Sequence, residues 1–170
     1  KTHEYQWSVI AEHPSIIASY LWNTFDFAVP MWGRGGVPAR NLKGLVTFDR
    51  KMKKDSYFWY KANWSKDPVL YLTQRRNTER EKKVTSVTIY SNIGTPKVYL
   101  NGQELNGIRK GYTDVHYVFD EVTLNNGKNT LTAIVRYKGK EYKDEIEWNY
   151  TGEKKRSADW SENKEEHAGW

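Results

Sequence analysis

The residues best suited to bind a polar ligand lie in the short string Asn41-Leu42-Lys43-Gly44. Asn41 and Lys43 stand two positions apart, so on an extended segment their side chains point to the same side. An amide and an ammonium on one side can converge on a single polar ligand. The same two residues could instead stabilise the loop that contains them, and the sequence alone leaves both interpretations open.

Two carboxylates are candidates for a catalytic or sugar-binding role. Glu4 could act as an acid or nucleophile, but a glutamate at the start of a helix is usually a favourable partner of the helix dipole. Asp26 lies four residues after Trp22, which places both side chains on one face of a strand. Asp26 is therefore predicted to hydrogen-bond a neighbouring loop or a sugar. Asp49 and Asp55 are predicted to occupy a turn and a helix cap.

Composition argues against several classes of site and partner. The chain has no cysteine, and its four histidines lack ligand spacing, so we expect no metal and no other cofactor. The net charge of +6 is concentrated in two basic groups, at 50–54 and 75–83, but no nucleic-acid-binding motif accompanies them. No apolar run approaches the roughly 18 residues of a membrane span. We therefore expect neither a nucleic-acid nor a membrane partner.

The elements that position these residues begin with a helix and a strand. Apolar spacing over 4–12 predicts a short helix, which Pro14 ends. The run 16–27 is apolar on both faces, as in a buried parallel strand. A short extended piece at 45–48 precedes a second helix, which is predicted to begin at Ser56. A helix followed by a buried strand is the repeating unit of an α/β barrel.

After Pro68 the apolar pattern changes to period two. Asn101-Gly102 and Lys138-Gly139 are plausible hairpin turns between the strands. Six or seven short strands in about 85 residues indicate an immunoglobulin-like β-sandwich. The predicted strands are 69–72, 84–90, 97–100, 115–119, 130–137 and 142–148. We therefore predict a mainly β fold: a partial α/β segment (1–66), a β-sandwich (67–150) and a charged linker or flexible tail (151–170).

Three blocks in the first 64 residues are similar to one enzyme family. They are LWNTFDF (21–27), NLKGLVTFDR (41–50) and KKDSYFWYKANW (53–64). In this order they resemble the last strand, the following loop and the last helix of the catalytic barrel in glycoside hydrolase family 2, most closely in bacterial β-galactosidases. Segments 87–92 and 98–102 resemble the accessory sandwich that often follows this barrel. The resemblance implies the end of a TIM barrel joined to that sandwich.

The resemblance also implies that the catalytic residues lie outside this chain. Retaining glycosidases use two carboxyl groups about 5 to 5.5 Å apart. In this family they are glutamates on the fourth and seventh barrel strands, upstream of the last strand. We therefore expect no catalytic residue here and no hydrolysis by the chain alone. By the same resemblance Trp22 lines the substrate pocket, with simple core packing as the alternative, and Asp26, Asn41 and Lys43 are the other predicted substrate contacts.

The sugar that the parent enzyme cleaves stays open at this point. The resemblance first favours a β-linked galactoside or related glycan. In β-glucuronidases of the same family, however, an Asn-x-Lys at this place binds the sugar carboxylate, so Asn41 and Lys43 also fit that specificity. Similar Asn-x-Lys-Gly strings occur in galactosidase-like members too. Localisation is unknown, and a periplasmic or secreted bacterial enzyme is a guess.

The sandwich has two alternative roles in the sequence. It could be a structural spacer, or a carbohydrate-binding module whose aromatic rings hold a glycan. The candidate rings are Tyr90, Tyr99, Tyr112, Tyr117 and Trp148. An isolated barrel edge exposes apolar surface. Residues 1–64 are therefore expected to pack onto the sandwich or to associate with another chain.

Overall fold

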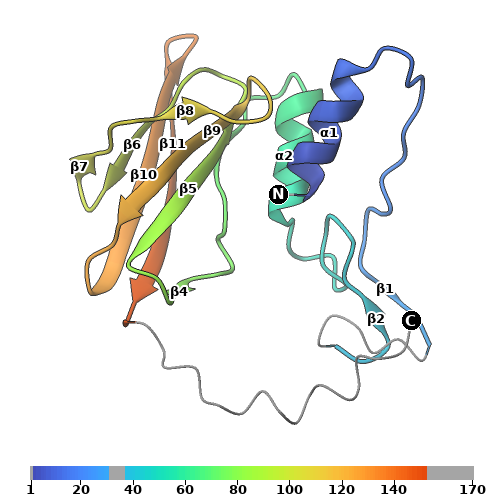
Figure 1. The fold of residues 1–170 in the computed structure, drawn as a ribbon, viewed down its shortest axis with the longest axis horizontal. Coiled ribbons are helices and arrows are strands. Elements are labelled where there is room, and N and C mark those ends of the chain that lie inside the picture. The colour runs from blue at the N-terminus through green and yellow to red at the C-terminus, as the bar shows by residue number, and fades with distance from the viewer. Residues whose placement is uncertain (1, 31–36, 153–170) are drawn as a thin grey trace.

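The structure, a computed structural model, describes residues 2–30 and 37–152 in two packed regions (Figure 1). The N-terminal region (residues 2–68) contains helices α1 and α2 and a two-stranded ribbon of β1 and β2. The sandwich (residues 69–152) contains strands β3 to β11. The predicted tail lies outside the described residues from position 153 onward. The bounds in the N-terminal region are α1 (Thr2–Glu12), β1 (Phe27–Ala28), β2 (Arg40–Asn41) and α2 (Asp55–Trp64).

Two sheets form the sandwich and confirm the predicted mainly β fold. One has the order β4-β11-β10-β6-β7 and the other β3-β5-β9-β8. All neighbours in them are antiparallel except β4 and β11. The described residues form no closed barrel. The strands are β3 (Leu70–Leu72), β4 (Glu79–Arg80), β5 (Val84–Ser91), β6 (Lys97–Leu100), β7 (Gln103–Glu104), β8 (Arg109–Lys110), β9 (His116–Thr123), β10 (Gly127–Tyr137) and β11 (Lys140–Tyr150).

The hairpin of β10 and β11 shows why this region folds from local signals. Its turn residues Lys138 and Gly139 both have positive φ, at 50° and 75°. That combination belongs to the type I′ turn, whose twist matches the flanking strands. Along β10, the inward residues Leu131, Ala133 and Val135 alternate with more exposed ones. The period-two pattern thus selects one face of β10 for the core.

The core between the two sheets is apolar and continuous. Its members come from both sheets, so neither sheet can bury its inner face without the other. The buried set is Leu72, Val87, Ile89, Val98, Tyr117, Phe119, Val122, Leu124, Leu131, Ala133, Ile146, Trp148 and Tyr150.

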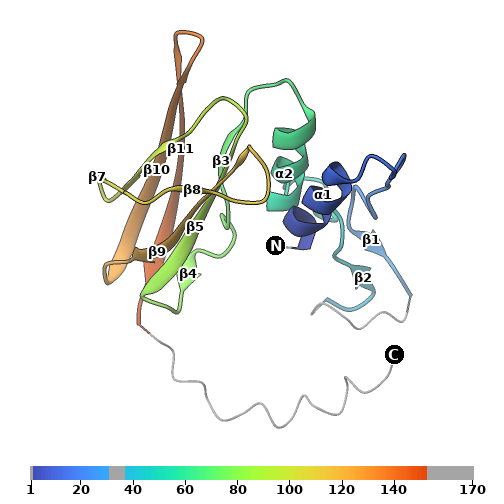
Figure 2. The same cartoon turned by 45° about the horizontal axis from the view of Figure 1, so that its top comes forward.

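A second apolar cluster joins α2 to the sandwich. The rings of Trp59 and Tyr90 lie 5.2 Å apart, which brings the helix against β5. Tyr71 of β3 stacks on Phe58 at 3.8 Å with the planes 11° apart. Both views show α1 and α2 side by side, on the side of the sandwich that carries β5 and β8 (Figures 1 and 2). The helices therefore cover part of the outer face of the second sheet.

The predicted buried strand over residues 16–27 is wrong in its extent and burial. Only Phe27 and Ala28 form a strand, and the side chains of Ile17 and Tyr20 are 97% and 93% exposed. A parallel barrel strand receives its hydrogen bonds and its cover from strands on both sides. Among the described residues this segment has only a parallel bridge between Phe25 and Val46 and the short ribbon of β1 and β2. The apolar pattern is present, but its partners are not.

Helix α2 begins one residue earlier than predicted. Its N-cap residue is Lys54, which makes no side-chain capping bond, and Asp55 is the first helical residue. The carboxylate of Asp55 instead accepts hydrogen bonds from Tyr71 Oη and the backbone N of Gln74, each at 2.8 Å. The expected capping role is therefore replaced by a connection to the sandwich. Neither of the two described helices is long and apolar enough to cross a membrane.

Candidate functional site

The chain segments around Asp26 and Asn41 meet in the ribbon of β1 and β2. In its antiparallel register Phe27 faces Asn41 and Ala28 faces Arg40. The backbone of Val46 then continues the pairing, since Asp26 N donates to Val46 O at 2.9 Å and Val46 N donates to Thr24 O at 2.9 Å. The structure thus brings the Asn41-to-Gly44 string beside Asp26, although eighteen positions separate Asp26 from Gly44.

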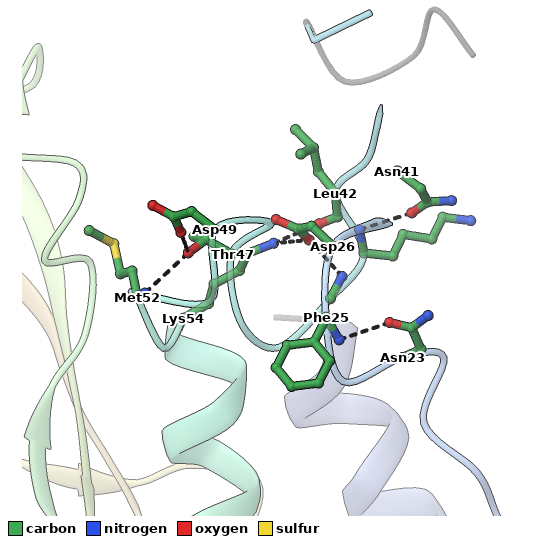
Figure 3. A network of polar contacts seen from close by, with 11 residues as sticks. Asn23, Phe25, Asp26, Asn41, Leu42, Thr47, Asp49, Met52 and Lys54 are labelled. Atoms are coloured by element: carbon green, nitrogen blue, oxygen red, sulfur yellow. Dashed lines mark hydrogen bonds and ion pairs between the residues drawn. The ribbon is translucent and has the colours of Figure 1, made fainter. Parts of the chain in front are cut away.

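Asp26 is the centre of a polar network that fixes this string (Figure 3). Its side chain is almost fully buried, with 3% of its surface exposed. Oδ1 accepts one hydrogen bond from Gly44 N at 2.9 Å and another from Lys54 Nζ at 2.5 Å. A buried carboxylate needs such partners. Asp26 therefore holds the loop, and its contacts support the loop-binding role rather than the sugar-binding one.

Gly44 is required by the close approach of two backbone segments. A Cβ atom on Gly44 would lie 2.1 Å from Asp26 N and 2.2 Å from Phe25 C. Real Cβ atoms never come this close to backbone, so any side chain here would displace the loop. The glycine of the Asn-x-Lys-Gly string thus has a packing reason.

Asn41 and Lys43 differ from the expected arrangement on one extended face. Asn41 is buried and Lys43 is exposed, because β2 ends at Asn41 and the chain turns. Asn41 Oδ1 accepts a hydrogen bond from Lys43 N at 3.0 Å, the pattern of an Asx turn. Figure 3 shows the Asn41 oxygen directed to this bond and its amide nitrogen directed away.

Two donors of the string have no partner in the described part of the chain. Lys43 Nζ makes no ion pair or hydrogen bond there, and neither does Asn41 Nδ2. Asn41 Oδ1, in contrast, is used by the turn. The loop therefore presents an ammonium and an amide N–H to a ligand while its backbone is held by internal bonds.

Trp22 lies near this loop through an intermediate ring. Its side chain is 70% exposed, and its ring meets that of Phe27 edge to face at 6.0 Å. Phe27 in turn faces Asn41 in the ribbon. No direct contact joins Trp22 to Asn41 or Lys43 in the described structure. The exposed indole beside the ribbon is available to stack on a sugar face.

Lys54 is the functional neighbour that the sequence did not reveal. Its Nζ donates to Asp26 Oδ1 and also to Leu42 O at 2.9 Å, and its backbone N donates to Leu45 O at 2.8 Å. Leu42 lies between the two candidate ligand residues. The only signal in the sequence was a lysine just before a helix, which is too common to indicate this role.

The turn after the string is self-contained, as predicted for Asp49. Thr47 Oγ1 donates to Asp49 Oδ1 at 2.5 Å, and Lys51 N donates to the same oxygen at 3.1 Å. The Thr47 hydroxyl and the Lys51 amide lower the pKa of Asp49. This carboxylate is a turn residue and does not take part in the loop network around Asp26.

Comparison with known proteins places this geometry in an enzyme family. No family model matches the chain. A β-glucuronidase from Bacteroides fragilis is 34% identical over 149 residues, which are 87% of this chain and 21% of the relative. A crystal structure of a B. fragilis protein provisionally assigned as a β-galactosidase is 80% identical, with a TM-score of 0.88, covering 90% of this chain and 23% of that one.

This chain is a piece of a family 2 glycoside hydrolase. A third relative, the FMN-binding β-glucuronidase of Faecalibacterium prausnitzii L2-6, is 40% identical with a TM-score of 0.75, over 87% of this chain and 22% of that chain. The chain spans about a fifth of the length of the first two curated relatives that it matches.

Glu4 of this glycoside hydrolase chain has a structural position. Its carboxylate accepts a hydrogen bond from Tyr90 Oη at 2.5 Å, and His116 Nε2 lies 3.9 Å from it. Burial raises the pKa of Glu4, but the opposing contributions, of which the bond from Tyr90 is the largest, outweigh burial and lower the pKa overall. The same contact raises the pKa of Tyr90, in addition to burial. Glu4 thus fastens α1 to the sandwich.

A cavity of about 830 Å³ lies between the helices and the second sheet, away from the loop. None of the four predicted substrate contacts lines it. Two arginines in its wall are already satisfied by the protein: Arg109 pairs with Asp120, and Arg80 donates to Gln74 and Thr85. We therefore assign the candidate sugar site to the loop rather than to this larger space.

The rings proposed for a carbohydrate-binding module are mostly inside the protein. Tyr90, Tyr117 and Trp148 are buried, and Tyr99 is half-buried. Only Tyr112 is exposed, and its ring stacks on His116 at 5.7 Å. These positions agree with packing in the sandwich and favour the structural role for it.

Proposed function

We propose that the chain supplies the sugar-acid-binding rim of a family 2 β-glucuronidase. The proposal rests chiefly on two donors that have no partner among the described residues, Lys43 Nζ and Asn41 Nδ2, on a loop whose backbone is fixed by Asp26 and Lys54. An ammonium that the described residues leave unpaired suits a ligand carboxylate, which accepts strong charge-assisted hydrogen bonds. A glucuronide carries such a carboxylate and a galactoside does not.

The names of the relatives support this specificity. The relatives from B. fragilis and F. prausnitzii described above carry the name β-glucuronidase. The provisional β-galactosidase of B. fragilis, at 80% identity, favours the second candidate, which is β-galactoside hydrolysis. In that case Lys43 would face a neutral sugar and its charge would contribute little to specificity.

The hydrolytic carboxylates are proposed to come from the rest of the enzyme. Cleavage with retention needs a nucleophile and an acid/base about 5 to 5.5 Å apart. In this chain Asp26 is bonded to Lys54 and Gly44, and Glu4 is bonded to Tyr90. Neither is available for that chemistry. The chain alone is therefore predicted to be inactive on chromogenic β-glucuronides and β-galactosides.

The test is Lys43→Met in the complete enzyme. Loss of one charged partner of a ligand carboxylate should lower kcat/KM for 4-nitrophenyl β-glucuronide about 100-fold or more. Hydrolysis of 4-nitrophenyl β-galactoside, if present, should change less than about twofold, because uncharged substrates lose no ion pair.

Lys51→Met is the matched control. Lys51 is an exposed lysine on the following turn, where its backbone N donates to Asp49. Its replacement should leave both activities unchanged. A glucuronide kcat/KM that survives Lys43→Met, or an equal loss on both substrates, would contradict the proposed specificity.

A further inference from the structure

Two neighbouring residues at the start of α2 reach in different directions. Lys54 extends its ammonium to the loop, where it meets Asp26 Oδ1 and Leu42 O. Asp55 extends its carboxylate to the sandwich, where it accepts from Tyr71 Oη and Gln74 N. One short stretch of backbone therefore connects the sugar-binding loop to the β-sandwich.

We propose that Lys54 is the positioning residue for sugar-acid recognition, and that it sets the place of Asn41 and Lys43 without touching the substrate. This inference rests on the proposed function, because it concerns the same loop. It assigns a role to a residue outside the Asn-x-Lys-Gly string, in a different element of the chain.

The contact with Leu42 O carries the argument. Leu42 is the residue between Asn41 and Lys43, so a bond to its carbonyl restrains the backbone from which both ligand groups project. Figure 3 shows Lys54 and Asp26 on the opposite side of the loop from the Asn41 amide nitrogen. Lys54 thus supports the loop from the side opposite the Asn41 amide nitrogen.

Burial makes the pair of Lys54 and Asp26 a restraint. Their side chains are 12% and 3% exposed, so water competes little for either group. Exposed ion pairs contribute little, whereas removing one partner of a buried pair leaves an uncompensated charge. The same carboxylate also holds Gly44 N. Loss of Lys54 would therefore disturb both ends of the string.

Charge gives Lys54 a second effect on the ligand. An unpaired Asp26 carboxylate under the loop would repel a sugar carboxylate held on the other side. Lys54 neutralises Asp26 and is itself satisfied by it. Lys43 is then left as the ammonium that can pair with the ligand. Positioning and charge balance both favour an anionic sugar over a neutral one.

Kinetics of the complete enzyme test the positioning role. Lys54→Met should raise KM for 4-nitrophenyl β-glucuronide about tenfold or more, because a small displacement of binding groups is costly. kcat/KM for the matching β-galactoside should change less than about threefold. Lys54→Arg, which keeps the charge and can donate to the same oxygens, should recover most of the glucuronide KM.

Lys53→Met is the control for this series. Lys53 is the adjacent lysine, and it lies over the Tyr57 ring at 4.9 Å rather than in the loop network. It should leave KM unchanged. If Lys54→Met does not fold, Asp26→Asn replaces it: this variant keeps an acceptor for Gly44 N but removes the ion pair, and it should raise KM for the glucuronide in the same way.

Hydrogen exchange on the 170-residue chain tests positioning without activity. In Lys54→Met the amides of Lys43 and Gly44 should exchange about tenfold faster, since their acceptors lose support. The amide of Leu131 in the sandwich core should be unaffected, which shows that the chain is still folded. Unchanged exchange at Lys43 and Gly44 would overturn the proposal.

The outcomes separate this inference from the proposed function. If Lys43→Met abolishes glucuronide preference while Lys54→Met changes neither KM nor amide exchange, the positioning role is overturned and the function stands. If Lys43→Met has no effect on glucuronide hydrolysis, the function fails. If the function fails in this way, faster amide exchange in Lys54→Met would still support the positioning of the loop by Lys54. An unchanged KM for the glucuronide in Lys54→Met would then overturn the role of Lys54 in sugar-acid recognition.

Discussion

The sandwich and the N-terminal region of this chain are held in their folded structures by different kinds of contact. The sandwich pairs its own strands and closes a core between two sheets. The N-terminal region relies on two helices, a two-residue ribbon and a few buried polar contacts, and it leaves Ile17 and Tyr20 in the open. The difference shows that a sequence pattern for burial produces burial only where its partners are in the same chain.

The contacts between the two regions include two specific polar bonds beside the apolar ring cluster. Glu4 bonds to Tyr90 and Asp55 bonds to Tyr71, in both cases from a helix to a tyrosine of the second sheet. Together with the ring cluster around Trp59 they fix the helices on the sandwich. The N-terminal region is therefore held in place by its contacts with the sandwich.

The largest expected effect is in the sandwich core. Leu131→Ala should lower the free energy of unfolding by about 2 to 5 kcal/mol, because Leu131 is fully buried between the sheets. Denaturant unfolding followed by circular dichroism measures it. If the sandwich supports the helices, tryptophan fluorescence should report loss of the α2 cluster in the same transition. A separate, unchanged transition for the helices would contradict the claim that the sandwich supports them.

The next effect is local to the loop. Gly44→Ala forces the loop away from the backbone of Phe25 and Asp26, at a cost of about 1 to 3 kcal/mol. Exchange of the Asp26 and Val46 amides should become faster while the sandwich amides stay protected. Leu42→Ala, which truncates a partly exposed side chain of the same loop, is the control and should leave exchange unchanged. Equal loosening throughout the chain would contradict a local role.

A smaller effect depends on pH. Burial lowers the pKa of His116, with Glu4 opposing it, so folded His116 binds a proton less readily than at its ordinary pKa of 6.5. The unfolded chain then takes up more protons below about pH 6.5, and stability should fall as the pH drops from there toward the folded pKa. His116→Asn, whose oxygen can accept from Tyr112 N, should reduce this loss.

His3 provides the check on that assignment. Burial lowers its pKa as well, so it contributes in the same direction and pH window. Thermal unfolding between pH 5 and 7 should therefore keep a weaker slope in His116→Asn and lose it further in the double variant with His3→Asn. A slope that is identical in the parent and in both variants would assign the effect elsewhere.

The smallest effect is expected in the extended segment. Ile17→Ser removes apolar surface that is already in water, so the free energy of unfolding should change by less than about 0.5 kcal/mol. We propose that this surface contacts the rest of the enzyme, or a second chain when the piece is alone. Sedimentation velocity should then show less self-association in Ile17→Ser. A large loss of stability would mean that the segment is packed after all.

Sequence patterns predicted the sandwich well and the ribbon poorly, for physical reasons. Strands β5, β6 and β10 were predicted within a few residues of their bounds, and along β10 buried residues alternate with more exposed ones. Strands β4, β7 and β8 were missed, since two residues are too few to show a period.

The residues of the candidate site could be predicted from the sequence. The hydrogen bonds and ion pairs that connect them were harder to predict. Sequence motifs indicated Trp22, Asp26, Asn41 and Lys43. The structure places Asp26 beside the loop, which agrees with one of its two expected roles, the hydrogen bond to a neighbouring loop. The opposite burial of Asn41 and Lys43 follows from a turn that begins where β2 ends. Lys54 lies 28 positions from Asp26, and no local pattern encodes such a pair.

The adjacency of Lys54 and Asp55 sets a rule for building chimeras of such enzymes. One residue inserted or deleted between them would change the relative placement of the two side chains, because Lys54 has an extended backbone and Asp55 is the first residue of the helix. Lys54 could then no longer bond to the loop while Asp55 bonds to the sandwich. A crossover for grafting a foreign sandwich must therefore fall after α2 and bring with it a hydroxyl and a backbone N–H in place of Tyr71 and Gln74.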